Sequence, residues 1–517
     1  MNASVFPKVF LPPERRKLLQ PPARSYRGCS CDDRFTIVSP RSDQRTAKSG
    51  EIQSMKLIFH RQPARIVHRV SFPRSVRRLA LTFIGVFVCA VDVSSRTSDD
   101  ENSIYDSNPK HLWNRLQETL FIRTAPGWKS YGIDRLDPLF WSSTKHLLVE
   151  PSHRQALAVL DEFLNVHGEK LIGDPLKRAW LQHDLWSLFD WSASPYRGEE
   201  FVRERQELQR PLALAIRRLA LSRDEIASLP DNYARAETNI LLTTLPRGLS
   251  QRDGDWVCVG ANGSSPVAPE HVSAFGGRSV FLVMLRLPEG RRAAVSYLDQ
   301  LRSFERPWAY TKQPGAARES LLLLNPEIPQ FPTNTQWGLV RRMCVIDTEG
   351  RVQPTPVTES IQVRRYLEMP PGTNSAIAQR LSFMQAQQFS EFVMSRRLEG
   401  LLRAVTKGEK DILFVQLHSG GMDPFEFVVP DGVAIEGPTR LREDELQSNV
   451  LQSCSNCHGL PGVQSVLTYN QTFGLTSFRR PPELVDSNPE HEAMVTIQWK
   501  HRQFDWGLLQ GLWKDFQ

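Results

Sequence analysis

The spacing of apolar residues changes near residues 246–248, Pro-Arg-Gly, and this change constrains the fold more than any other feature of the sequence. Before it, apolar side chains recur at intervals of three and four residues, the spacing of one helix face. After it, they form short β-rich runs separated by Gly, Pro and Asn, as in strands joined by turns. Both patterns must bury an apolar face, so the chain is predicted to be a multi-domain α+β protein.

The first block predicts three helices. The first covers 152–168, the second follows Asp174-Pro175, and the third covers 200–223 and is expected to bend at Pro211. The histidines of these helices are expected at the surface or in packing, and the tryptophans of the second in the core. These residues are His153, His167, His183, Trp180, Trp186 and Trp191.

The second block predicts strands with two helices between them. We expect a buried strand at 279–288, preceded by a turn at Gly276-Gly277, and paired strands at 339–347 and 352–366. The remaining expected elements are helices at 291–303 and 376–406 and a strand at 411–418.

The N-terminal part resembles an export signal. An uncharged apolar run at 79–91 follows Arg74, Arg77 and Arg78, and Met55 can serve as initiator. A helix needs roughly 20 apolar residues to cross a bilayer, so this run fits a signal peptide better than a membrane anchor. The expected location is therefore periplasmic or secreted, with cleavage near residue 90 and no stable transmembrane anchor afterwards.

The basic charge of the chain resides in this N-terminal part. Residues 1–90 hold 17 Lys and Arg against 5 Asp and Glu, a net of +12, whereas the whole chain carries +7, which leaves −5 for the rest. An acidic remainder has no electrostatic attraction for phosphates, so nucleic acid is not an expected partner.

A Cys-x-x-Cys-His motif stands at Cys454, Cys457 and His458. It resembles the haem-attachment site of c-type cytochromes, in which two thiols bond to one porphyrin and the adjacent imidazole is the proximal iron ligand. The resemblance covers only this pentapeptide and its flanks. It implies one covalent haem c, electron transfer or redox sensing, and a redox partner protein.

The sequence after the motif is shorter than in small c-type cytochromes, because 59 residues follow His458. The haem module is therefore expected either to pack on the upstream part or to share its pocket with it. The predicted segments are 1–54 (a disordered or non-native extension), 55–90 (signal peptide), 91–104 (linker), 105–245 (helical domain), 246–447 (α+β domain) and 448–517 (a small, mostly helical haem module).

Further haem-site residues follow from their chemistry. A predicted helix from Asn488-Pro489 to about Gln503 places Met494 and His501 nearly on one face. Met494 is the first choice for the distal iron ligand and His501 the second, while an ordinary core position for Met494 remains open. Less specific candidates are Met422 and His418 as ligands, Arg479 and Arg480 for the propionates, the carbonyl of Pro461 for the proximal imidazole, and Phe473, Leu475, Phe478 and Trp499 as pocket walls.

Two alternatives stay open for the motif. Cys454 and Cys457 can bind structural zinc together with His491 and His501, or they can form a disulfide or stay free in a secreted binding or scaffold protein. No hydrolase, metalloprotease or nucleotide-binding signature accompanies the motif, so an electron carrier is expected before a hydrolase.

The other two cysteines of the chain after residue 91 lie in strand-like runs. Cys258 and Cys344 can form a disulfide in an oxidising compartment or remain as two buried thiols.

Overall fold

The computed structural model describes residues 103–122, 146–194, 201–239, 242–261, 263–305, 308–312, 320–325, 327–369, 387–404, 462–467 and 483–514. All of them belong to one of two units of the chain, and the other unit, Asp32–Arg96, lies outside the described residues. The described part contains helices and an antiparallel seven-stranded sheet, so the α+β class is confirmed.

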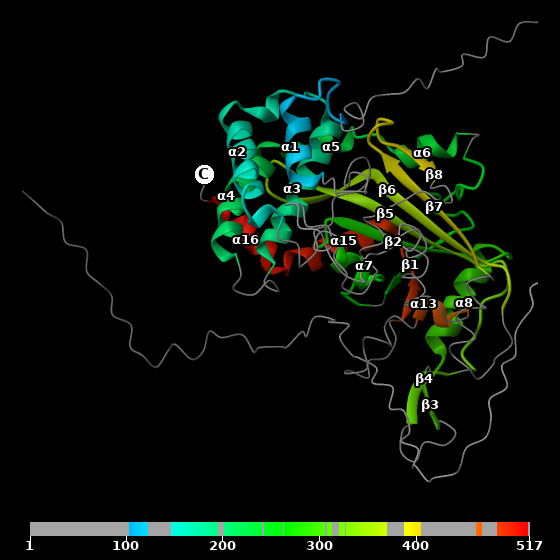
Figure 1. Ribbon diagram of the computed structural model, residues 1–517. Helices are drawn as coiled ribbons and strands as arrows, with labels where there is room; N and C mark the ends of the chain where they lie inside the picture. Colours follow the sequence, from blue (N-terminus) through cyan, green and yellow to red (C-terminus); the bar gives the residue numbers. More distant parts are fainter. Residues whose placement is uncertain are drawn as a thin grey trace, which may run out of the picture. The chain divides into compact units, whose positions relative to one another are not determined.

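The helices of the described residues lie mostly before and after the sheet in sequence (Figure 1). They are α1 (Leu112–Phe121), η3 (His146–Leu148), α2 (Ser152–Asn165), η4 (Gly168–Lys170), α3 (Pro175–Ala193), α4 (Val202–Arg218), α5 (Arg223–Ala227), α6 (Asn232–Glu237), α7 (Pro269–Ala274), α8 (Arg291–Ser303), α13 (Gln464–Leu467), α15 (Pro489–His501) and α16 (Phe504–Lys514).

The strands form one large sheet and a separate hairpin. They are β1 (Val257–Ala261), β2 (Ser279–Arg286), β3 (Trp308–Lys312), β4 (Ser320–Leu324), β5 (Gln336–Ile346), β6 (Val352–Tyr366), β7 (Gln387–Ser395), β8 (Leu401–Ala404) and β9 (Leu484–Asp486). The large sheet has the order β8-β7-β6-β5-β2-β1-β9, and β3 pairs only with β4.

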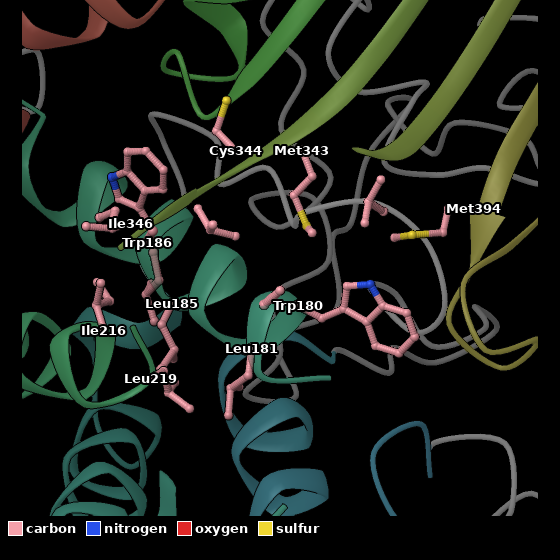
Figure 2. Packing of buried hydrophobic residues seen from close by; sticks show 14 of the residues in the cluster. Trp180, Leu181, Leu185, Trp186, Ile216, Leu219, Met343, Cys344, Ile346 and Met394 are labelled. Atoms are coloured by element: carbon pink, nitrogen blue, oxygen red, sulfur yellow. The ribbon is translucent and has the colours of Figure 1, made fainter. Parts of the chain in front are cut away.

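Helix α3 is the central helix of the fold. Its N-terminus is capped by the Asp174 carboxylate, which accepts from Leu176 N at 2.8 Å, and Pro175 occupies the first turn. Sixteen of its residues are buried, because it contacts α4, α16 and β5. Figure 2 shows its side chains between those of α4, such as Ile216, and those of the strands, such as Met343.

Side chains alternate between the two faces of the sheet. On β1, Cys258 belongs to the core cluster on the side of helices α1–α6, whereas Val257 and Val259 belong to a second cluster with α8. The first cluster extends from Ile104 to Trp513 and draws residues from the end of the predicted linker and from all three predicted domains. The segment boundaries at 246 and 448 stay predictions.

Strand β6 bulges in its middle. Its pairing with β5 shifts between Arg341 and Arg342 and again between Arg342 and Cys344. The side chain of Asn232 compensates for the interrupted ladder: its amide donates to Thr358 O at 2.8 Å, and its oxygen accepts from Thr358 N at 2.8 Å. The bulged segment thus keeps its backbone hydrogen-bonded by contact with α6.

Most of the expected elements are confirmed. The structure has helices at α2, α3, α4, α8 and α15, the paired strands β5 and β6 around a turn at Gly350, and the turn at Gly276-Gly277 before β2. Helix α4 continues through Pro211 to Arg218. The expected strand at 411–418 lies outside the described residues.

The helix expected at 376–406 is wrong where the structure describes it. Residues 387–395 form β7, which pairs with β6 from Gln387↔Tyr366 to Val393↔Ser360, and β8 follows after a turn at Glu399-Gly400. The run contains good helix formers, but pairing with a neighbouring strand outweighs propensities of a few tenths of a kcal/mol per residue.

Of the described helices, none combines the length and the apolar character that crossing a membrane requires. The apolar run at 79–91 lies outside the described residues.

Candidate functional site

The motif itself lies outside the described residues, as do the two arginines proposed for the propionates. The same holds for the carbonyl, ligand and pocket-wall candidates other than Trp499. These residues are Cys454, Cys457, His458, Arg479, Arg480, Pro461, Met422, His418, Phe473, Leu475 and Phe478. The described chain resumes at Gly462, four residues after His458.

The segment that follows the motif is attached to the sheet. Val463 N donates to Gln330 Oε1 at 2.9 Å, and the hydroxyls of Ser465 and Tyr366 are hydrogen-bonded. Val463 and Leu467 are buried in the cluster formed with β1, β2 and α8. Residues 462–467 are therefore fixed at the end of β6, where Tyr366 lies.

The next described segment contains β9, which is an edge strand of the large sheet. β9 pairs with β1, and Ser487 N donates to Cys258 O at 2.8 Å. The Asn488 side chain then caps α15 by accepting from His491 N at 2.8 Å. Both segments after the motif are thus joined to the upstream fold.

Helix α15 turns a stripe of ligand-type side chains to the solvent. Exposed residues recur at His491, Met494, Gln498 and His501, which is one helix face. The predicted shared face of Met494 and His501 is confirmed. The alternative of Met494 as a core residue is wrong, since it is 48% exposed while its neighbours Ala493 and Val495 are buried.

The His501 imidazole is held by an aromatic neighbour. It stacks on Trp506 of α16, with ring centroids 5.3 Å apart and planes 22° from parallel. Partial burial lowers the pKa of His501, which favours the neutral ring, the form that binds metal ions.

Trp499, predicted as a pocket wall, packs on the second layer of the fold. It lies against the cluster of Val272, Phe275 and Phe281, between α7 and β2. Its position there is that of a packing residue.

The continuous helix disfavours the zinc alternative. His491 and His501 are ten residues apart on α15, a rise of about 15 Å, whereas zinc ligand atoms lie about 2 Å from the metal. Two imidazoles at that separation do not meet at one ion. Within the described ranges, no three His, Cys, Asp or Glu side chains are arranged to hold a metal ion.

The histidines and tryptophans of the first helices take the expected places. His153 and His183 are buried and His167 is exposed, while Trp180, Trp186 and Trp191 belong to the core. His153 contacts Leu147 O and the Glu207 carboxylate, both at 2.9 Å.

Buried charged groups inside the core were not predicted. Arg396 of the β7–β8 turn pairs with Asp184 of α3, and the Tyr105 hydroxyl donates to the same carboxylate at 3.4 Å. Burial raises the pKa of Tyr105, which keeps it a hydrogen-bond donor. The signal in the sequence is a carboxylate in a helix rich in Leu and Trp, because such a group needs a partner once it is buried.

A second group joins α3 to the bulged strand. His183 Nδ1 lies 2.8 Å from Cys344 O and therefore carries the proton, while Nε2 faces Glu359 Oε1 at 3.4 Å. Glu359 also accepts from Ser279 Oγ at 2.6 Å and pairs with Arg341 at 3.3 Å. All five residues are buried, so this group fixes α3 on the sheet rather than meeting a substrate.

Cys258 and Cys344 are two separate buried thiols, so the disulfide alternative is wrong. Burial raises the pKa of Cys258 to about 12 and that of Cys344 further. Both thiols stay protonated and unreactive at neutral pH.

A third buried group joins Asp190 of α3 to Arg278, Lys500 and Asp505. Its partners come from the chain before β2 and from the two C-terminal helices.

Comparison with known proteins finds no match: no protein-family model, no curated protein and no solved structure matches the chain.

Proposed function

We propose that the chain is an exported, periplasmic or secreted protein that binds one haem c covalently and uses it in electron transfer or redox sensing. The observation that carries the proposal is the Cys454-Ser-Asn-Cys457-His458 motif. The apolar run at 79–91 supports it, because cytochrome c haem is attached after export.

The attachment of the flanking segment supports a pocket shared with the upstream fold. Four peptide units separate His458 from Gly462, so their Cα atoms lie at most about 14 Å apart. Gly462 is buried next to Gln330 and the end of β6. A proximal ligand at His458 would therefore lie within reach of the sheet.

The exposed stripe of α15 supports Met494 as the distal ligand. β9 and the segment at Val463 contribute to one buried cluster, and α15 begins three residues after β9. Met494 lies about 8 Å along the axis from the helix start and His501 about 18 Å. The thioether is thus nearer to the segment that follows the motif, and His501 remains the second choice.

The bound haem would supply a one-electron iron couple, and the residues around it would determine its position and reduction potential. Cys454 and Cys457 would hold the porphyrin, His458 would hold the iron, and Arg479 and Arg480 would pair with the propionates. A methionine as sixth ligand raises the reduction potential, which would suit an electron carrier.

Mass spectrometry of protein from a host that matures c-type cytochromes tests the proposal. We expect the mature chain to carry the mass of one haem on the peptide containing Cys454 and Cys457, with a Soret band that survives acid-acetone extraction. The matched variant Cys454→Ala,Cys457→Ala loses both signals, whereas Cys258→Ala keeps them.

An unmodified motif peptide from the same host overturns the proposal. Stoichiometric zinc on that protein would support a structural metal site, and a disulfide or two free thiols would support a binding or scaffold protein.

A further inference from the structure

Four charged side chains meet inside the fold, from α3, the turn before β2 and the two C-terminal helices. Lys500 Nζ of α15 donates to Asp190 Oδ2 of α3 at 2.7 Å and also to Asp505 of α16. Arg278 Nη1 donates to the same Asp190 oxygen at 2.7 Å. The Lys500 side chain is 0% exposed and that of Asp190 is 8% exposed, so the contact is dry.

The surrounding chain is shaped for this contact. A Cβ at Gly276 would lie 3.0 Å from Asp190 Oδ2, and a Cβ at Gly277 would lie 3.1 Å from Lys500 Cβ. Both glycines have left-handed backbone angles, φ +58° and +70°. The turn before β2 therefore lets α3 and α15 approach each other, and the Trp186 ring covers Lys500 Nζ at 5.2 Å.

The surroundings shift the pKa values of the Asp190 and Asp505 carboxyl groups in opposite directions. Burial and the nearby Asp505 charge raise the pKa of Asp190 to about 7, against the opposing effect of Lys500 and Arg278. Burial alone would raise the pKa of Asp505, but Lys500 and the interaction with Asp190 lower it. Asp190 is thus the group that accepts a proton, and Asp505 is the group that stays a carboxylate.

We propose that Lys500 and Asp190 become joined by an intramolecular isopeptide bond, with Asp505 as the general base and Arg278 as the donor that holds Asp190 Oδ2, the oxygen that leaves. A lysine amine, a carboxyl group and a second carboxylate in a water-excluded contact are the components that such an amide bond needs.

The distance suits direct attack. Lys500 Nζ is 2.7 Å from Asp190 Oδ2, and a carboxyl oxygen lies about 1.2 Å from its carbon, so Nζ lies within about 4 Å of Cγ. This approaches the separation of about 3 to 3.5 Å at which bound groups react. The buried position keeps the geometry fixed and excludes competing water.

The step balances without any further reactant. The Lys500 ammonium passes one proton to the Asp190 carboxylate, which leaves a neutral amine and a neutral acid. The amine attacks Cγ and forms the C–N bond, while Arg278 stays hydrogen-bonded to Oδ2, which is now the hydroxyl oxygen. Asp505 takes a second proton from the nitrogen and returns it to the hydroxyl, which leaves as water when the C–O bond breaks.

The bond would close a loop across most of the folded chain. Residues 190 and 500 are 310 positions apart, and the loop between them contains the sheet and the Cys-x-x-Cys-His motif. A cross-link of this kind stabilises mainly by restricting the unfolded chain. It would keep α15 on α3 when the rest of the fold is strained, whether or not haem is bound.

Intact-mass measurement of the denatured full-length mature chain tests this proposal. We expect the mass to be lower than the sequence requires by one water, after any haem is accounted for. Tryptic digestion should yield a branched peptide that joins the α3 and α15 segments, with no cleavage after Lys500. A haem would appear on a different peptide, so failure of one proposal leaves the other measurable.

The variant Asp505→Asn separates a bond from an ion pair. It keeps the size of the side chain and both partners of the bond but removes the base, so we expect the full sequence mass and cleavage after Lys500. Asp161→Asn, at an exposed position of α2, should retain the cross-link. Wild-type protein with the full sequence mass, or with Lys500 bonded to Asp505, overturns the proposal.

Discussion

The two faces of α15 differ in what surrounds them. Its outward face carries Met494 and His501, whose side chains reach solvent in the described structure, whereas its inward face carries Glu492, Thr496 and Lys500, which are buried against β1, β2 and α3. The sequence predicts the outward face, because side chains that can bind iron recur there at helical spacing. On the inward face, the charged residues Glu492 and Lys500 fix the position of α15 against the rest of the fold.

Substitution of Lys500 should have the largest effect on this docking. Lys500→Ala leaves Asp190 and Asp505 buried with Arg278 as their remaining cation, and loss of one member of a buried charge group costs about 3 to 5 kcal/mol. In urea, the Lys500→Ala variant should unfold at a lower midpoint concentration than the wild-type protein. Lys514→Ala, at an exposed position of α16, should change the free energy of unfolding by less than about 0.5 kcal/mol, and equal effects of the two would contradict the assignment.

Substitution of Gly260 on β1, which lies close to the start of α15, should give the next largest loss of stability. A Cβ at Gly260 would lie 2.3 Å from Glu492 Oε1 and 2.7 Å from Ser487 Cβ, so Gly260→Ala must displace the start of α15. Overpacking of this kind costs about 1 to 3 kcal/mol, measurable by thermal unfolding. In Gly507→Ala, on α16, the new Cβ meets nothing within 4 Å, and helix propensity should stabilise the protein by up to about 1 kcal/mol.

Glu492 should make the docking depend on pH. Burial raises its pKa above 4.5, partly opposed by the hydrogen bond from Ser487 and by His491. Because the folded-state pKa is raised, the stabilisation is complete below pH 4.5 and is lost as pH rises through the folded-state pKa. Glu492→Gln should flatten this part of the stability profile, in which the slope for one group is at most about 1.4 kcal/mol per pH unit. An unchanged profile would exclude Glu492 as its source.

Local patterns predicted much of the fold and little of its interior chemistry. The capping pairs Asp174-Pro175 and Asn488-Pro489 located the starts of α3 and α15, because a cap acts within one turn of the chain. The segment that forms β7 was wrongly predicted as helix, since its state depends on pairing with β6, about 30 residues away.

The buried ionic contacts could not be predicted for a related reason. Asp190 signals that a partner is needed, because it is a carboxylate between Phe189 and Trp191, but Lys500 is 310 residues away and nothing local identifies it. The helix face that bears Met494 could be predicted, since a periodicity of 3.6 residues assigns it. The residues that pack against that face cannot be predicted in this way, because they come from distant parts of the sequence, as Lys500 does for Asp190.

The residues on the outward face of α15 should contribute least to the free energy of unfolding and most to the spectrum and reduction potential of the bound haem. Met494→Ala should alter the free energy of unfolding by less than about 0.5 kcal/mol, because the side chain is 48% exposed. In the haem-loaded protein it should shift the absorption spectrum of the oxidised form and lower the reduction potential, as loss of a thioether ligand does. His501→Ala is the matched comparison, and a spectral change confined to it would transfer the distal ligand to the imidazole stacked on Trp506. A large stability loss for Met494→Ala without haem would instead place this residue in the core, against the exposed face on which the assignment rests.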